Sequence, residues 1–281
     1  MTAVARHQRA DGAAILSIAC DSSGASRLRD LYQRAPCRML FPDVAPGEPV
    51  QAVLLTTSGG LTGGDRTHVE FNVGVNARAT LTTQAAEKLY RALPGAAAVE
   101  CAVVLTAGAD AWAEWLAQET ILFNGARLRR SFSADLAPGS RMLAVESIVF
   151  GREAMGEDLR VGMLHDSWRI RRAGRLVWAD AVRLEGDIAA LRLRPFGFGA
   201  ALACATVVYA AQDAGELLEP VRALLAAGPD ESGVTLLDGL LIIRLLDSDS
   251  PRLRARVAGV AGLIRHTAAG VSRTLPRVWH C

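Results

Sequence analysis

The stretch LTTSGGLTGGDRTHVEFNVGVNARATLTTQAAEKLY, residues 55–90, says more about the fold than any other part of the chain. It contains two glycine pairs, Gly59-Gly60 and Gly63-Gly64, and the carboxylate of Asp65 follows directly. Glycine permits a positive φ and a close approach of two backbone segments that a Cβ would prevent. The pairs therefore predict a loop of defined shape at residues 58–66, between two strands.

Strand patterns extend outward from this loop in both directions. Residues 52–57 precede it, residues 67–73 follow it, and a turn at Gly74 and Asn76 leads to a further strand at 77–83. Similar short apolar or alternating runs recur along the first two thirds of the chain, at residues 14–19, 37–41, 99–106, 111–116, 121–123, 127–136, 142–150, 159–170, 176–184 and 201–210. Spacing of about 8–12 residues with Gly, Pro and Asn between the runs predicts an all-β sandwich, barrel or coiled stack of sheets.

Helical patterns occur only near the end of the chain. Residues 214–226 form one candidate, with Pro220 in its middle. Residues 251–267 form a stronger one, because Asp249 or Ser250 can cap it and Pro251 suits a first turn. No repeat and no low-complexity linker marks a domain boundary, so we expect one domain over residues 1–281.

Composition narrows the class of protein. Hydrophobic residues make up 51% and charged residues 21% of the chain, which excludes disorder. A net charge of +2 argues against nucleic acid or an anionic membrane as the main partner. The five cysteines are scattered without a CxxC pair, and the N-terminus lacks an apolar signal segment. The uncharged stretch 195–212 is expected to be a buried strand with a lead-in loop rather than a membrane span, and the protein to be cytoplasmic.

The glycine-rich loop does not predict nucleotide binding. It matches neither GxxxxGK[ST] nor GxGxxG, and the strand after it offers no helix N-terminus to an anion. A β-turn loop is the preferred interpretation. Asp65 either caps this turn or serves as a site residue.

Carboxylates in apolar surroundings are the main candidate site residues. Glu119 lies in WLAQETILF, Glu146 in MLAVESIVF and Asp180 in LVWADAVRL. In one interpretation these acids lie on the outer faces of their strands and point into solvent. In the other, they line a polar path for a divalent cation together with Asp65, since oxygen ligands release such ions readily. The competing hypothesis makes Glu119 and Glu146 an acid and base for hydrolysis. The histidines have no metal-site spacing, and the terminal pair His280-Cys281 is expected to be solvated.

Long blocks of sequence resemble one known family. These blocks are LYQRAPCRMLFP (31–42), VLLTTSGGLTGGDR (53–66), ATLTTQAAEKLYRA (79–92), EWLAQETILFNGARLRR (114–130), VESIVFGREAMGE (145–157), WRIRRAGRLVWADAVRLEGD (168–187), DGLLIIRLL (238–246) and LPRVW (275–279). They occur in family order over nearly the whole chain. The chain is similar to urease accessory proteins of the UreD family, also called UreH.

The resemblance implies a fold and a function. It implies a mainly β fold, a β-helix-like stack of sheets with a few short C-terminal helices. It also implies a non-catalytic maturation factor that joins UreF and the GTPase UreG, docks on apo-urease as part of a hetero-oligomer (a dimer among the possible forms), and helps to insert nickel. No cofactor is expected to be tightly bound, because nickel would only pass through.

The resemblance also assigns residues. Asp65, Glu119, Glu146 and Asp180 would contact the passing metal, and the neutral oxygens of Thr83 and Gln84 would line an internal tunnel. The apolar stripe of the helix at 251–267 and the arginines of the basic tail, rather than the resemblance, suggest that these segments form part of the UreF contact; the alternative for the helix is that it covers a face of a sheet.

Overall fold

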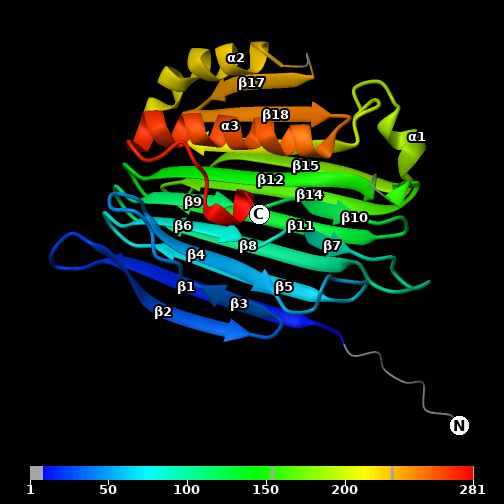
Figure 1. Cartoon of the computed structure of the whole chain (residues 1–281), viewed down its shortest axis with the longest axis horizontal. Helices are drawn as coiled ribbons and strands as arrows, with labels where there is room; N and C mark the ends of the chain where they lie inside the picture. The colour runs from blue at the N-terminus through cyan, green and yellow to red at the C-terminus, as the bar shows by residue number, and fades with distance from the viewer. Residues whose placement is uncertain (1–8, 153–154, 229–230, 281) are drawn as a thin grey trace, which may run out of the picture.

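The computed structural model describes residues 9–152, 155–228 and 231–280, so Cys281 of the terminal pair lies outside the described residues. Within these residues two large sheets make up most of the molecule (Figure 1). The first sheet has the order β15 (Arg175–Asp187), β14 (Val161–Arg172), β11 (Arg127–Leu136), β8 (Val99–Ala107), β5 (Arg66–Val73), β1 (Asp11–Cys20) and β2 (Ser26–Arg34). The second has the order β17 (Ser232–Leu237), β18 (Leu240–Asp247), β16 (Ala203–Ala210), β12 (Arg141–Arg152), β9 (Trp112–Leu116), β6 (Arg78–Thr83), β4 (Val50–Thr56) and β3 (Cys37–Leu40). Three short strands complete it: β7 (Glu87–Leu89), β10 (Thr120–Leu122) and β13 (Glu157–Asp158).

The chain winds between the two sheets in successive coils. From β4 to β12 it alternates between them, and the short strands β7 and β10 extend the second sheet through the pairing of β10 with β12. Neighbouring coils pair in parallel: β5 with β8 and β8 with β11 in the first sheet, β4 with β6 and β6 with β9 in the second, and β7 with β10. This winding confirms the expected mainly β, β-helix-like stack of sheets.

Apolar side chains fill the space between the sheets. On β11, Leu128, Phe132 and Leu136 are buried at alternate positions, because successive strand residues point to opposite faces. Phe132 contacts Trp168 of β14, with ring centroids 4.7 Å apart. The interior is thus a packed core, and any polar group in it must find a partner.

Helices cover the outer face of the second sheet. The expected helix at 251–267 is α3 (Ser250–Ala269), in which the Asp249 carboxylate accepts a hydrogen bond from the Arg252 amide and Gly270 ends the helix at φ 66°. Its apolar side chains, among them Val257 and Ile264, pack with β16 and β18. The helix therefore covers a sheet face, one of the two roles expected for it (Figure 1).

The remaining helices are short. The expected helix at 214–226 is divided into the 3-10 helix η2 (Gln212–Leu217) and α2 (Leu218–Ala226), so Pro220 falls in a first turn, where it is tolerated. The sequence did not suggest α1 (Ile188–Arg192) or η3 (Arg277–His280). The uncharged stretch 195–212 is a loop leading into the buried strand β16, as expected. None of the helices in the described residues has the length and apolar character needed to span a membrane.

Candidate functional site

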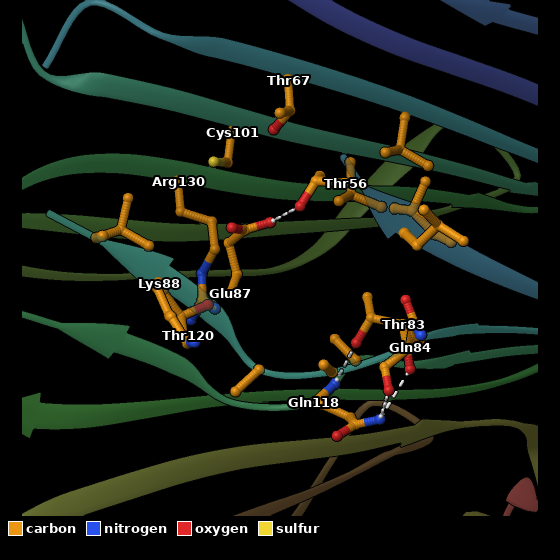
Figure 2. Close-up of a pocket in the computed structure, with 18 of the residues that line it drawn as sticks. Thr56, Thr67, Thr83, Gln84, Glu87, Lys88, Cys101, Gln118, Thr120 and Arg130 are labelled. Atoms are coloured by element: carbon orange, nitrogen blue, oxygen red, sulfur yellow. Dashed lines mark hydrogen bonds between the residues drawn. The ribbon is translucent and has the colours of Figure 1, made fainter. Parts of the chain in front are cut away.

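A cavity of about 250 Å³ lies inside the coils, close to the glycine-rich loop. Exposed residues, including Gly59, Gln84 and Lys88, line its outer end, and the buried side chains of Arg130 and Glu146 line its inner end. Figure 2 shows Arg130, Thr120 and Glu87 directed into the same space, with Gln118 and Thr83 to one side. The cavity therefore leads from the surface to charged groups in the core.

Neutral oxygens and one unexpected amide line the outer part of the cavity. Thr83 and Gln84, predicted as lining residues, both lie there. The side-chain nitrogen of Gln118 donates to the backbone carbonyl oxygens of Thr83 and Gln84, each at 2.9 Å (Figure 2). The backbone amide of Gln118 donates to the Thr83 hydroxyl, also at 2.9 Å. Gln118 thus fixes the end of β6 against the segment that follows β9.

A carboxylate that the sequence analysis missed, Glu87, lies in the same cavity. It accepts a hydrogen bond of 2.9 Å from the Thr56 hydroxyl (Figure 2). Burial raises the pKa of Glu87, and the bond from Thr56 opposes this shift. The first cavity thus contains an acid in addition to Glu146.

Three charged side chains meet at the inner end. The Arg130 guanidinium donates to Glu146 at 2.5 Å and, through two nitrogens, to both oxygens of Asp166 at 2.9 Å. Glu146 also accepts from the Trp115 indole at 2.8 Å, and the Thr120 hydroxyl lies 3.1 Å from Arg130. The side chains of Arg130 and Glu146 are only 6% and 5% exposed. Burial raises the pKa of Glu146, while the charge of Arg130 opposes that shift. The triad joins β11 and β14 of one sheet to β12 of the other.

A second cavity, of about 260 Å³, begins on the other side of the triad. It is lined at its inner end by Arg130, Glu146 and Asp166, and at its outer end by exposed residues that include Phe196 and Arg244. Both cavities thus share Arg130 and Glu146. The two cavities, with the triad at their shared inner ends, are called the interior route here.

Cysteine thiols along this route are protonated at neutral pH. Burial raises the pKa of Cys101 in the first cavity and of Cys204 in the second, in each case to about 12. The thiolate, not the thiol, is the metal ligand. Oxygen atoms are therefore the main ligands that this route offers to a cation.

Asp65 is placed away from both cavities. Its carboxylate accepts from the Ala10 amide at 2.9 Å and from the Thr62 amide at 2.7 Å. It therefore caps the glycine-rich turn and ties β1 to it, the first of the two roles that the sequence left open.

The other predicted acids do not share one cavity. Glu146 lies on the route, whereas Glu119 pairs with Arg254 of α3 at 2.7 Å beside a separate groove. Asp180 is partly exposed and pairs with Arg244, which lines the second cavity, so it lies near that cavity's outer end. Glu119 and Glu146 thus lack the common cavity that an acid and base for hydrolysis would require. In the parts of the chain that the structure describes, no group of three or more His, Cys, Asp and Glu side chains could hold a metal ion.

The glycine-rich loop closes onto the chain beside the first cavity. The Leu61 amide donates to the Lys88 carbonyl and the Tyr90 amide to the Leu61 carbonyl, both at 2.8 Å. At Gly60, with φ 140°, a Cβ would lie 2.5 Å from the Tyr90 ring and 2.8 Å from the Lys88 carbonyl oxygen. The defined loop shape predicted from the glycine pairs is therefore required by this contact.

Gly60→Ala is expected to lower the free energy of unfolding by about 2–3 kcal/mol, because strained backbone and a steric overlap combine. Gly59→Ala is the matched control: Gly59 has φ 71°, and no atom lies within 4 Å of its added Cβ. That variant should lose only about 1 kcal/mol, the cost of a positive φ. Thermal and urea unfolding of the two variants measure the difference, and equal losses would contradict the close-approach argument.

Comparison with known proteins agrees with the resemblance found in the sequence. The family model described as UreD urease accessory protein matches residues 10–280. A Magnetococcus marinus protein named urease accessory protein UreD is 42% identical over 261 residues, covering 91% of this chain and 89% of that protein. A protein of the same name from a Methylobacterium species is 41% identical, over 98% of this chain and 96% of that protein. One from Rhizobium leguminosarum is 39% identical over the full length of both chains, 100% of each. The chain therefore belongs to the family of UreD urease accessory proteins.

Proposed function

We propose that this chain conducts nickel ions through its interior to the active site of apo-urease, as the non-catalytic partner of UreF and the GTPase UreG. The observation that carries the proposal is the pair of cavities that share Glu146. A route with surface-exposed residues at both outer ends suits passage better than storage. Glu146 is the carboxylate that an ion meets from either side.

The chemistry of the lining supports transient contact. Threonine and glutamine oxygens and scattered carboxylates hold nickel more loosely than imidazole or thiolate do. Burial raises the pKa of the Cys101 and Cys204 thiols, so binding of the ion by either thiol carries the cost of removing its proton. An ion therefore moves between weak sites instead of resting in a strong one.

Glu146→Gln tests this function. Co-expressed with urease and the other accessory proteins, the variant should lower the nickel content of purified urease about tenfold, because removal of a charged group beside a metal typically costs that factor. Metal analysis of the urease and its activity per subunit are the measurements. Glutamine keeps the volume of the side chain and one acceptor oxygen for the two donors, Trp115 and Arg130. A thermal unfolding curve verifies that the variant folds.

Two further variants locate the route. Glu100→Gln alters an exposed acid on β8, paired with Arg66 at 3.1 Å, and serves as the control that should leave urease nickel unchanged. Glu119→Gln alters a buried acid beside the α3 groove. A nickel loss with Glu119→Gln but not with a folded Glu146→Gln would overturn the interior route and favour one along that groove.

A further inference from the structure

The Arg130 guanidinium occupies the junction of the two cavities. Its contacts there are all with oxygen: Glu146, both oxygens of Asp166 and the Thr120 hydroxyl. These carboxylate and hydroxyl oxygens come from both sheets and meet at one point. Oxygen atoms arranged in this way are suitable ligands for a divalent cation. In this structure the positive charge at that point is the arginine's own.

Burial explains why a cation must be present there. An unpaired carboxylate in the core is strongly unfavourable, so Glu146 and Asp166 need a positive partner. Arg130 supplies it permanently, because a guanidinium does not lose its proton in proteins. The same permanent charge repels any metal ion that arrives while the guanidinium stays in place.

We propose that Arg130 closes the nickel route as a resident cation, and that a divalent ion crosses by taking its place between Glu146 and Asp166. This proposal rests on the function proposed above. Since one cation replaces another, the two carboxylates remain compensated throughout the exchange. Arg130 lines both cavities, so the displaced side chain has space on either side of the junction.

Arg130→Met tests the exchange directly. The variant leaves two carboxylates without their cation, so the purified full-length chain should gain about one Ni²⁺ site. If the open state is a minor population of the parent protein, Ni²⁺ should bind on the order of tenfold to a thousandfold more tightly than to the parent. Titration calorimetry and equilibrium dialysis with Ni²⁺ measure this gain. Adding Glu146→Gln to the Arg130→Met chain should abolish it.

A matched control separates this gain from general damage to the core. Arg192 is also buried, but it pairs with a single carboxylate, that of Asp158, at 3.0 Å. Arg192→Met should therefore gain no Ni²⁺ site. A folded Arg130→Met chain that binds Ni²⁺ no better than the parent and Arg192→Met would overturn the proposal.

Arg130→Lys decides the matter if the methionine variant fails to fold. Lysine keeps the charge but replaces a two-pronged contact with a single point contact, so Ni²⁺ should displace it more easily than arginine. Affinity equal to the parent's would refute the exchange. Nickel binding by this chain and nickel delivery to urease are measured separately, so the two proposals can fail separately. If Arg130→Met gains a Ni²⁺ site while Glu146→Gln leaves the nickel content of urease undiminished, the exchange at Arg130 stands and the delivery route is rejected. If Glu146→Gln lowers the nickel content of urease while Arg130→Met gains no Ni²⁺ site, the route stands and the exchange is rejected.

Discussion

Replacing Glu114 with alanine is expected to lower the free energy of unfolding by about 3–5 kcal/mol, since it removes the fully buried one of the two carboxylates that pair with the Arg265 cation. The Glu114 side chain is fully buried and accepts hydrogen bonds from Thr80 at 2.6 Å, from the Trp112 indole at 2.8 Å and from the Arg265 guanidinium at 2.9 Å. Burial acts to lower the pKa of Arg265, yet the carboxylates of Glu114 and Glu48 raise it. Loss of Glu114 would thus affect α3 and the second sheet together.

Two other variants provide the comparison. Glu114→Gln keeps the volume and some of the hydrogen bonds and should lose less stability than the alanine variant. Glu48→Ala removes the other carboxylate partner of Arg265. The Glu48 side chain is 19% exposed, so this variant should lose less stability than either Glu114 variant. Urea unfolding followed by circular dichroism ranks the three. An alanine variant as stable as the parent would show that the ion pair is dispensable.

Trp279→Ala is expected to cost about 3–5 kcal/mol, the usual loss when a buried tryptophan is truncated. Although it lies near the end of the chain, Trp279 is 5% exposed and packs in the core between the second sheet and α3. Its indole donates to the Thr82 hydroxyl at 3.1 Å, and the Arg254 guanidinium lies 5.0 Å from its ring centre. The variant would leave a cavity and remove both contacts.

The measurement is again the unfolding midpoint, with His280→Ala as the control, because that neighbouring side chain is exposed and should change stability by less than about 0.5 kcal/mol. A midpoint for Trp279→Ala equal to that of His280→Ala would contradict the packing argument. The same argument limits the use of tail deletions: removing residues 275–281 also removes buried Leu275. Weaker partner binding by such a chain would report damage to the core as much as a lost contact.

Strand positions could be predicted from the sequence because alternation is local. The run at 127–136 alternates in burial almost residue by residue, and the glycine-rich loop lies where the pattern stops. Strand pairing could not be predicted in the same way. Arg66 lies opposite Glu100, and Arg127 opposite Met163, yet the coils share no sequence repeat that would indicate these registers. Contacts between distant residues, rather than local preference, determine them.

The alternation of β11 indicates that Arg130 is buried. It lies at an inward position between Leu128 and Phe132, whereas its neighbour Arg129 is exposed. Glu114 lies between Trp112 and Leu116 in β9, a strand that is buried at every position because α3 packs against its outer side. Charged residues in phase with buried ones indicate ion pairs in the core. The partners of Arg130 and Glu114 could not be predicted from the sequence, because Asp166 and Arg265 lie on other elements of the fold.

Asp65 shows the opposite limit. A carboxylate after two glycine pairs is compatible with a cap and with a site residue, and the sequence has no feature that separates them. Ala10 decides between them: its amide lies at the Asp65 carboxylate because β1 pairs with β5, a contact between distant residues.

Lys88 lies exposed at the outer end of the first cavity, and it is the only lysine in a chain with many arginines. Amine-selective labelling would therefore modify the protein at one side chain, apart from the α-amino group. A fluorophore attached at Lys88 would stand at the mouth of the route, where quenching by a paramagnetic ion would turn metal arrival into an optical signal.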